Sequence, residues 1–513
     1  MWCTVFFVSG QVLLWCNAFS LPITLFGWLF ILVMSRLWSF SRHTEQQHLQ
    51  QQLKALIQWV RQDRFSMYIL GFSLGVFLLL LTRSLLLPPL SHDAMMYHGP
   101  RAAHFVQQGS FQMPWGPSGW GDFQYYPPAQ EVLLAWFLLP THSLMFFGVL
   151  DFFAGFFLFI SILALWKHVQ GTLTPLWTAF FAALFMAIPA FWKLLGAGYN
   201  DLLLSSMLLS SIVLLYEAWK TRQTHYVILC FMALGVAAGL KLPGLFFGGC
   251  LFLIAVGMWL SLFINTRNNA QKQHDKQSIS EAHSIIVARN ARALQWGKAL
   301  WVGGACMFLM NVPWMMHNIQ QTGLPLSPHP LSVAGIQLGR SPSGVLNFFI
   351  RRRIPSFISG YNKRIWKYER HSHLRLFFHR LQQGPVFGEL GLLCFICLPL
   401  GLFLLWRIKP FLALLCTTLF GANLYGFYHP QFTFVRLFCA TSNTRFLLQS
   451  ACISCLSFAL LWHTWIKTLP KTRTRIFFRS WSLICALVWG IHFFTFNGWI
   501  AQEIFPIAQL SLL

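Results

Sequence analysis

Apolar residues dominate this chain in runs of about 20, the length that an α-helix needs to cross a bilayer. Short polar or basic connections separate these runs, and the pattern predicts about twelve membrane-spanning helices. The predicted spans lie near residues 4–34, 65–87, 143–166, 174–195, 201–219, 225–243, 245–264, 296–316, 386–406, 410–428, 444–465 and 479–499. The apolar stretch 129–140 is too short to cross and is expected to form a re-entrant or partly inserted helix.

Composition agrees with this pattern and excludes an ordinary soluble protein. The 513 residues are 56% hydrophobic and only 10% charged, with a mean hydropathy of +0.56. The net charge of +24 comes without any separate basic domain, so we expect membrane lipids as partners and no nucleic acid. The sequence also has no Asn-x-Ser/Thr glycosylation site, which favours a bacterial inner (plasma) membrane.

Basic residues predict the sidedness of the chain. When the spans alternate, the short basic connections fall on one side, which the positive-inside rule makes cytoplasmic. Residues 317–383 form a long basic loop that falls on the opposite side, and long loops translocate despite their charge. Two interpretations of its basicity stay open, a phosphate-bearing partner and contact with anionic headgroups.

Carboxylates are scarce, which makes their positions informative. Of thirteen, Asp93, Asp122, Glu131 and Asp201 gather at the predicted external face, each next to a span. Ionisable groups near the membrane are costly, so these acids are functional candidates, with helix capping as the alternative.

Asp93 begins the stretch DAMMYHGPRAAHFVQQGSF. If this stretch is α-helical, Tyr97, Arg101 and His104 share one polar face with Asp93, although Pro100 could interrupt the helix. One acid among cations suits sugar transfer from a polyprenyl phosphate, because the phosphate leaves as a stable anion and only a base is required. Glycoside hydrolysis, in contrast, uses two carboxylates.

Five segments, in order from about residue 90 to 455, are similar to conserved elements of a known superfamily. They are DAMMYHGPRAAHFVQQGSF, YYPPAQEVLLAW, GAGYNDLLLSS, GLKLPG followed by NVPWMMHNIQQTGLPLSPHP, and SNTRFLLQS. Together they resemble the GT-C superfamily of membrane glycosyltransferases, in particular the family 39-like bacterial relatives of protein O-mannosyltransferases and of the lipid A aminoarabinose transferase.

The resemblance implies a role for each matching residue. Asp93 would be the base that deprotonates the acceptor. Two acids would organise the pocket, through hydrogen bonds or through a divalent cation, and both options stay open: Glu131 and Asp201. Three cations would bind the donor phosphate or, alternatively, snorkel at the interface: Arg101, Lys241 and Arg445. Four residues would support the site: Tyr97, His98, His104 and Tyr126.

The predicted fold is an all-α, polytopic integral membrane bundle of GT-C type, with about 12 transmembrane helices, a re-entrant helix and two external loops. Its predicted parts are an N-terminal transmembrane helix and cytoplasmic amphipathic segment (1–64), a catalytic transmembrane core (65–316) with the first external loop (88–128), the basic external loop (317–383), and C-terminal transmembrane helices (384–513).

The predicted function is inverting transfer of a monosaccharide, a hexose or pentose, from a polyprenyl phosphate to a glycolipid or protein acceptor. The reaction would take place at the periplasmic face, in lipopolysaccharide or protein glycosylation. Two alternatives remain: a transporter or flippase of a lipid-linked precursor, and an O-antigen ligase-like enzyme that uses a pyrophosphate-linked glycan. A transporter would require charges within spans, and Asp151 is the clearest acid of that kind.

Overall fold

The computed structural model describes residues 2–29, 63–86, 89, 91, 93–111, 123–143, 147–274, 279–326, 332–333, 336–338, 388–428 and 447–495. In this part of the chain nearly all regular structure is helical. The exception is one antiparallel pair of two-residue strands, β1 (Ser332–Val333) and β2 (Ile336–Gln337).

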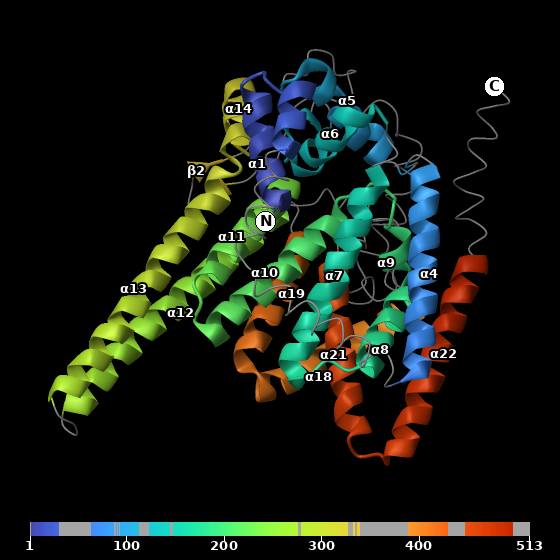
Figure 1. Cartoon of the computed structure of the whole chain (residues 1–513), viewed down its shortest axis with the longest axis vertical. Coiled ribbons are helices and arrows are strands. Elements are labelled where there is room, and N and C mark those ends of the chain that lie inside the picture. The colour runs from blue at the N-terminus through green and yellow to red at the C-terminus, as the bar shows by residue number, and fades with distance from the viewer. Residues whose placement is uncertain are drawn as a thin grey trace, which may run out of the picture.

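The helices follow the apolar runs of the sequence (Figure 1). Up to residue 240 they are α1 (Trp2–Trp15), α4 (Arg64–Leu86), the π-helix η1 (Ala94–His98), α5 (Gly99–Gln108), the 3-10 helix η2 (Phe123–Tyr125), α6 (Ala129–Thr141), α7 (Phe147–Gln170), α8 (Pro175–Ala187), α9 (Pro189–Lys193), α10 (Asp201–Thr221) and α11 (His225–Leu240). After residue 241 they are α12 (Leu242–His274), α13 (Ile279–Leu309), α14 (Val312–Thr322), α18 (Gly388–Ile408), α19 (Pro410–Tyr428), α21 (Leu448–Ile466) and α22 (Lys471–Thr495).

Several of these helices are long and apolar enough to cross a membrane. Within the described residues there are five such helices: Arg64–Leu86, Phe147–Gln170, Asp201–Thr221, Leu242–Ser261 and Leu390–Ile408. A sixth span forms if Ala293–Leu309 and Val312–Thr322 count together, since they meet at a bend of 42°. The chain is therefore a helical protein of multi-pass membrane character, and the count of about twelve spans stays a prediction.

Besides the predicted span 296–316, which contains this bend, two predicted spans are interrupted in the structure. The predicted span 174–195 breaks between α8 and α9, where Ile188 is extended. Pro189 explains this break, because proline pushes the preceding residue out of the helical region. The predicted span 4–34 breaks after α1, where Asn17 adopts a left-handed conformation with φ 54°. The N-terminal helix is thus shorter than the single span expected.

Helix α1 packs against the helices that carry the candidate site. The indole Nε1 of Trp136 in α6 donates a hydrogen bond to the carbonyl of Phe6 at 2.7 Å. The amide Nε2 of Gln11 donates to the carbonyl of Met310 at 2.5 Å. These buried hydrogen bonds join α1 to α6 and to the α13–α14 junction.

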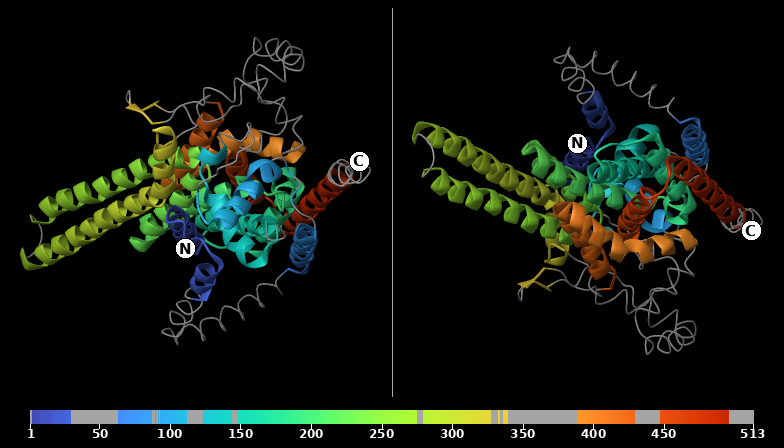
Figure 2. Two further views of the ribbon diagram at one scale, coloured as in Figure 1. Left: turned by 90° about the horizontal axis from the view of Figure 1, so that it is seen from above. Right: turned by 90° about the horizontal axis from the view of Figure 1, so that it is seen from below.

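The polar residues 265–295 between two predicted spans are largely helical. Helix α12 extends to His274 and α13 begins at Ile279, and the two project side by side away from the rest of the molecule (Figures 1 and 2). Alanine, glutamine, lysine and arginine are frequent in this segment and are good helix formers, which explains why the spans continue into it.

Charged residues of separate connections lie close together near one end of the helical body. Helices α5, α6 and α14 lie at one end, and the α21–α22 connection lies at the other (Figure 1). Near that second end His168 pairs with Glu217 at 3.2 Å, and the charges of Lys167, Lys220 and Lys409 act on the histidine. Residues of separate basic connections thus meet, as the alternation of spans requires.

Candidate functional site

Asp93 lies at the start of a helical segment that Pro100 does not interrupt. The π-helix η1 leads directly into α5, where Pro100 occupies the first turn. Pro100 thus lies where the π-turn passes into α5. Asp93 is half-buried, and its side chain makes no capping hydrogen bond to the helix. The capping alternative for Asp93 therefore finds no support in this geometry.

The π-turn changes which side chains face inward. Its i→i+5 hydrogen bonds insert extra chain before α5, so the expected single face does not form as an ideal α-helix would place it. His98 and Arg101 are each only 1% exposed, whereas Tyr97 and His104 are half-buried. His98 thus takes the inward position beside Arg101, where the α-helical pattern placed Tyr97.

Glu131 forms a buried ionic cluster with His98 and Arg101. Its Oε1 lies 2.9 Å from Nδ1 of His98 and 3.6 Å from Nη1 of Arg101. The carboxylate lies in the first turn of α6, where the helix dipole favours a negative charge. Burial alone would raise the pKa of Glu131, but Arg101, His98 and a backbone hydrogen bond outweigh it and lower the pKa. The glutamate is therefore held ionised.

Arg101 connects this cluster to the loop before α6. Its Nη2 donates hydrogen bonds to the carbonyls of Gln124 at 3.0 Å and Tyr126 at 2.7 Å. Burial lowers the pKa of Arg101, against the raising effects of Glu131 and Tyr97. With its guanidinium enclosed by protein, Arg101 is placed to hold the loop in position, which differs from the phosphate contact that the resemblance implied.

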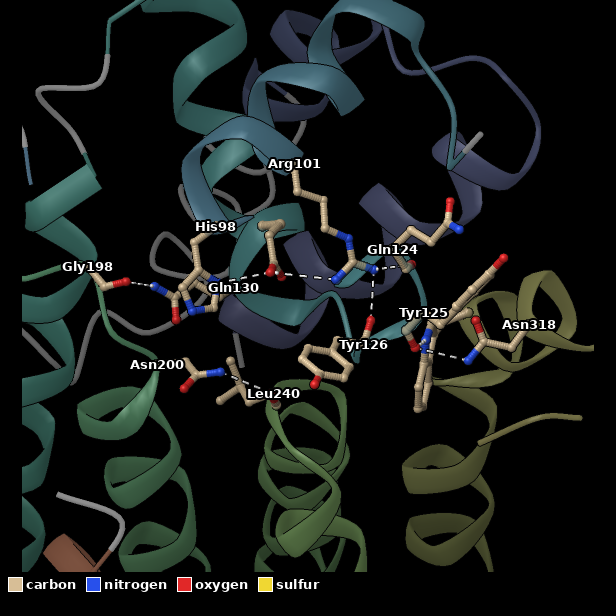
Figure 3. A network of polar contacts seen from close by, with 12 residues as sticks. His98, Arg101, Gln124, Tyr125, Tyr126, Gln130, Gly198, Asn200, Leu240 and Asn318 are labelled. Carbon is tan, nitrogen blue, oxygen red and sulfur yellow. Dashed lines mark hydrogen bonds and ion pairs between the residues drawn. The ribbon is translucent and has the colours of Figure 1, made fainter. Parts of the chain in front are cut away.

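A second set of donors holds the same loop from α14. The carbonyl of Tyr125 accepts hydrogen bonds from Trp314 Nε1 at 2.9 Å and from Asn318 Nδ2 at 3.1 Å. Three consecutive carbonyls, from Gln124 to Tyr126, are therefore bound by side chains (Figure 3). Trp314 and Asn318 lie in the predicted PWMMHN element, but the pattern gave no role to either residue.

Asp201 and Lys241 form the other ion pair of the site. Nζ of Lys241 lies 2.6 Å from Oδ1 of Asp201, the first residue of α10. Lys241 separates α11 from α12 in an extended conformation, with φ −154° and ψ 148°. The Asp201 side chain is 1% exposed and the Lys241 side chain 21%. The aspartate thus orients the ammonium group of a lysine whose side chain is partly exposed.

The loop from Gly196 to Asn200 joins the two ion pairs. Nε2 of Gln130, the neighbour of Glu131, donates to the carbonyl of Gly198 at 3.1 Å. Nδ2 of Asn200 donates to the carbonyl of Leu240, the neighbour of Lys241, at 3.1 Å (Figure 3). A Cβ atom on Gly198 would lie 2.8 Å from Cβ of Ala94, the residue after Asp93. Three segments that carry the candidate acids therefore converge on one loop.

Among the described residues, no group of three or more His, Cys, Asp or Glu side chains is arranged to hold a metal ion. Glu131 contacts His98 and Arg101, and Asp201 contacts Lys241. These contacts favour the hydrogen-bonding option for the two acids over shared coordination of a divalent cation, which would require convergent oxygen ligands.

The remaining candidates are placed in part. The rings of Tyr97 and Tyr126 meet edge to face with centroids 6.2 Å apart, and the Tyr97 ring also contacts His98 at 4.1 Å. These aromatic groups thus border the cluster around Glu131. Arg445 and the basic segment 339–387 lie outside the described residues. The role of each candidate stays a prediction.

Comparison with known proteins gives a structural likeness but no sequence match. No protein-family model matches the sequence, and no curated protein matches it. The structure is similar to the archaeal oligosaccharyltransferase AglB from Archaeoglobus fulgidus, solved in complex with an inhibitory peptide and a dolichol-phosphate. The TM-score is 0.40 and the identity 11%, over 81% of this chain and 54% of that one. The chain thus spans about half the length of that protein.

Proposed function

We propose that this chain is an inverting glycosyltransferase that moves a monosaccharide from a polyprenyl phosphate to a glycolipid or protein acceptor at the external face of a bacterial inner membrane. One observation carries the proposal. The segments of Asp93, Glu131, Asp201 and Lys241 meet around the Gly196–Asn200 loop. A base and a cation from separate segments are the groups that such a transfer requires.

In the proposed reaction the carboxylate of Asp93 takes the proton of the acceptor hydroxyl. The oxygen attacks the anomeric carbon from the face opposite the phosphate, and the bond between that carbon and the phosphate oxygen breaks. The polyprenyl phosphate leaves with the electron pair. No general acid is needed, because the leaving phosphate is a stable anion, unlike the alkoxide of a glycosidase.

Lys241 is the proposed phosphate ligand among the described cations. Asp201 holds its Nζ at 2.6 Å, and the lysine side chain retains 21% exposure. A compact ammonium group binds phosphate as a point charge, so it does not require the planar geometry of an arginine. Arg445 is proposed to act with it, from a position outside the described residues.

Arg101, His98 and Glu131 are proposed to support the site from inside the protein. All three side chains are 1–2% exposed, and Glu131 contacts both of the others. Arg101 also donates hydrogen bonds to the carbonyls of Gln124 and Tyr126. In this role the cluster fixes the segment of Asp93 against α6, and Arg101 does not contact the donor.

The transporter alternative required Asp151 as a charge deep within a span. In the structure Asp151 lies about one turn inside the start of α7, and its Oδ2 accepts a hydrogen bond from the backbone of Gly198 at 2.7 Å. Its side chain therefore has a local backbone partner beside the candidate site. This contact favours the transferase.

The test is transfer of radiolabelled sugar in membranes that contain the protein. A panel of monosaccharides linked to undecaprenyl phosphate is compared with the same sugars on undecaprenyl pyrophosphate. The proposal predicts transfer from at least one monophosphate donor, unchanged in the variant Glu217→Gln, whose glutamate pairs with His168 near the opposite end. Transfer from pyrophosphate donors alone would instead favour the ligase-like alternative.

A further inference from the structure

Asp151 is a buried carboxylate for which the proposed chemistry has no use. It is 1% exposed, and its Oδ2 accepts the N–H of Gly198 at 2.7 Å. The backbone N–H of Gly196 also interacts with this carboxylate. Both glycines have a φ of 75°, in the left-handed region that favours glycine. Asp151 thus stabilises a conformation of the loop that few sequences adopt.

The loop leaves little space for adjustment. A Cβ atom on Gly196 would lie 2.6 Å from Cβ of Ser84, and one on Gly198 would lie 2.8 Å from Cβ of Ala94. Such distances are closer than side chains pack, so the glycine backbone lies directly against α4 and η1. A shift of the loop would therefore move the neighbouring segments or open a gap beside them.

Two neighbours of this loop carry residues of the proposed reaction. Gly198 faces Ala94, which follows Asp93 in sequence. The loop ends at Asn200, whose side chain binds the carbonyl of Leu240, and the next residue is Asp201. The charge of Asp201 acts on Asp151. The loop that Asp151 holds is thus the shared support of the proposed base and the proposed phosphate ligand.

We propose that Asp151 is a positioning residue of the site. By accepting the amides of the Gly196–Asn200 loop, it fixes the spacing between the segment of Asp93 and the Asp201–Lys241 ion pair. It acts through the loop, without touching the substrate. The inference rests on the proposed function for its effect on donor binding, while its effect on the loop is independent of any activity.

The experiment compares Asp151→Ala and Asp151→Asn in the full-length protein in nanodiscs. Asparagine keeps a carbonyl oxygen that can accept the Gly198 amide, whereas alanine removes the acceptor. The matched control is Ser161→Ala, because Ser161 Oγ lies 2.9 Å from Ser210 Oγ and joins the same two helices, α7 and α10, away from the loop. Three quantities are measured: hydrogen exchange of the peptide that contains residues 196–200, affinity for undecaprenyl phosphate, and thermal midpoint.

The alanine variant is expected to exchange faster over residues 196–200 and to lose affinity about tenfold, since a small misplacement of a binding group has effects of that order. The asparagine variant is expected to stay close to the wild type in both its exchange rate over residues 196–200 and its affinity for undecaprenyl phosphate. Ser161→Ala changes neither of them, whatever its thermal midpoint. This ordering separates positioning from a general loss of stability, which the serine control would share.

Two failures are distinguishable. If the wild-type protein binds undecaprenyl phosphate and Asp151→Ala matches it in affinity and exchange, the inference is wrong and the proposed function stands. If the wild type does not bind undecaprenyl phosphate, the proposed donor is wrong, and the exchange measurement alone decides whether Asp151 holds the loop. Faster exchange in both the alanine and asparagine variants, equal in size, would contradict a role for the acceptor oxygen.

Discussion

Arg101 and Tyr126 are joined by a hydrogen bond of 2.7 Å from the guanidinium Nη2 to the backbone carbonyl, inside the group of helices that encloses the candidate site. The same nitrogen donates to the carbonyl of Gln124 at 3.0 Å. Arg101 could use its positive charge in two roles: to hold the loop before α6, as we propose, or to bind the donor phosphate. The two roles predict different results when the planar guanidinium is replaced.

Arg101→Lys keeps the charge and removes the planar group that reaches two carbonyls. We expect a loss of stability of about 3 kcal/mol, because a lysine ammonium cannot reach Glu131 and both carbonyls together, which leaves buried acceptors unpaired. The measurement is the unfolding transition in detergent, compared with Arg222→Lys. A variant of normal stability with weaker binding of undecaprenyl phosphate would instead identify Arg101 as a donor ligand.

The stability of the wild type is expected to depend on pH through Glu131, which lies in α6, a helix too short to span the membrane. Its pKa in the folded protein lies below the ordinary value of 4.5. The folded state therefore binds the proton less tightly than the unfolded chain. This contribution is complete above the unfolded pKa and is lost as the pH falls through the folded pKa.

Thermal midpoints measured from pH 7 downward check this prediction. In the wild type the contribution of Glu131 declines below about pH 4.5, and Glu131→Gln lacks that part of the decline. The variant is also less stable at neutral pH, because the charge of Arg101 then remains buried without its carboxylate. Parallel curves for the two proteins would show that Glu131 does not titrate differently on folding.

Lys241→Gln removes the proposed phosphate ligand from the exposed side of its ion pair. We expect about a tenfold loss of affinity for undecaprenyl phosphate, which corresponds to one hydrogen bond to a charged group. Affinity for undecaprenol, which has no phosphate, should not change. Lys220→Gln in the last turn of α10 is the control, and an equal loss in both variants would indicate a general effect of surface charge.

The sequence predicted the elements of this fold better than their interruptions. The apolar runs form helices because a segment within a membrane must satisfy its backbone hydrogen bonds internally. Local chemistry decided the breaks, such as Pro189 within a predicted span. The π-turn at Ala94–His98 was not predictable from periodicity, because a 3.6-residue pattern assumes the register that the turn changes.

The sequence was enough to predict which residues belong to the candidate site, but it did not predict which of them contact one another. Scarcity of carboxylates was enough to select Glu131 and Asp201. Their partners, however, are 33 and 40 residues away in sequence, at His98 and Lys241, and only the tertiary structure brings them together. The same limit applies to Asp151, whose partner Gly198 carries no chemical signal in the sequence.

The most direct test of the central claim compares cells that express the wild-type chain with cells that express Asp93→Asn at equal level, by mass spectrometry of membrane glycolipids and glycoproteins. Glu217→Gln is the matched control for loss of a carboxylate. If Asp93 is the base, one monosaccharide mass will be missing from one acceptor in Asp93→Asn alone. An identical profile in the wild type and Asp93→Asn, with the modified acceptor present in both, would contradict the assignment of Asp93 as the base.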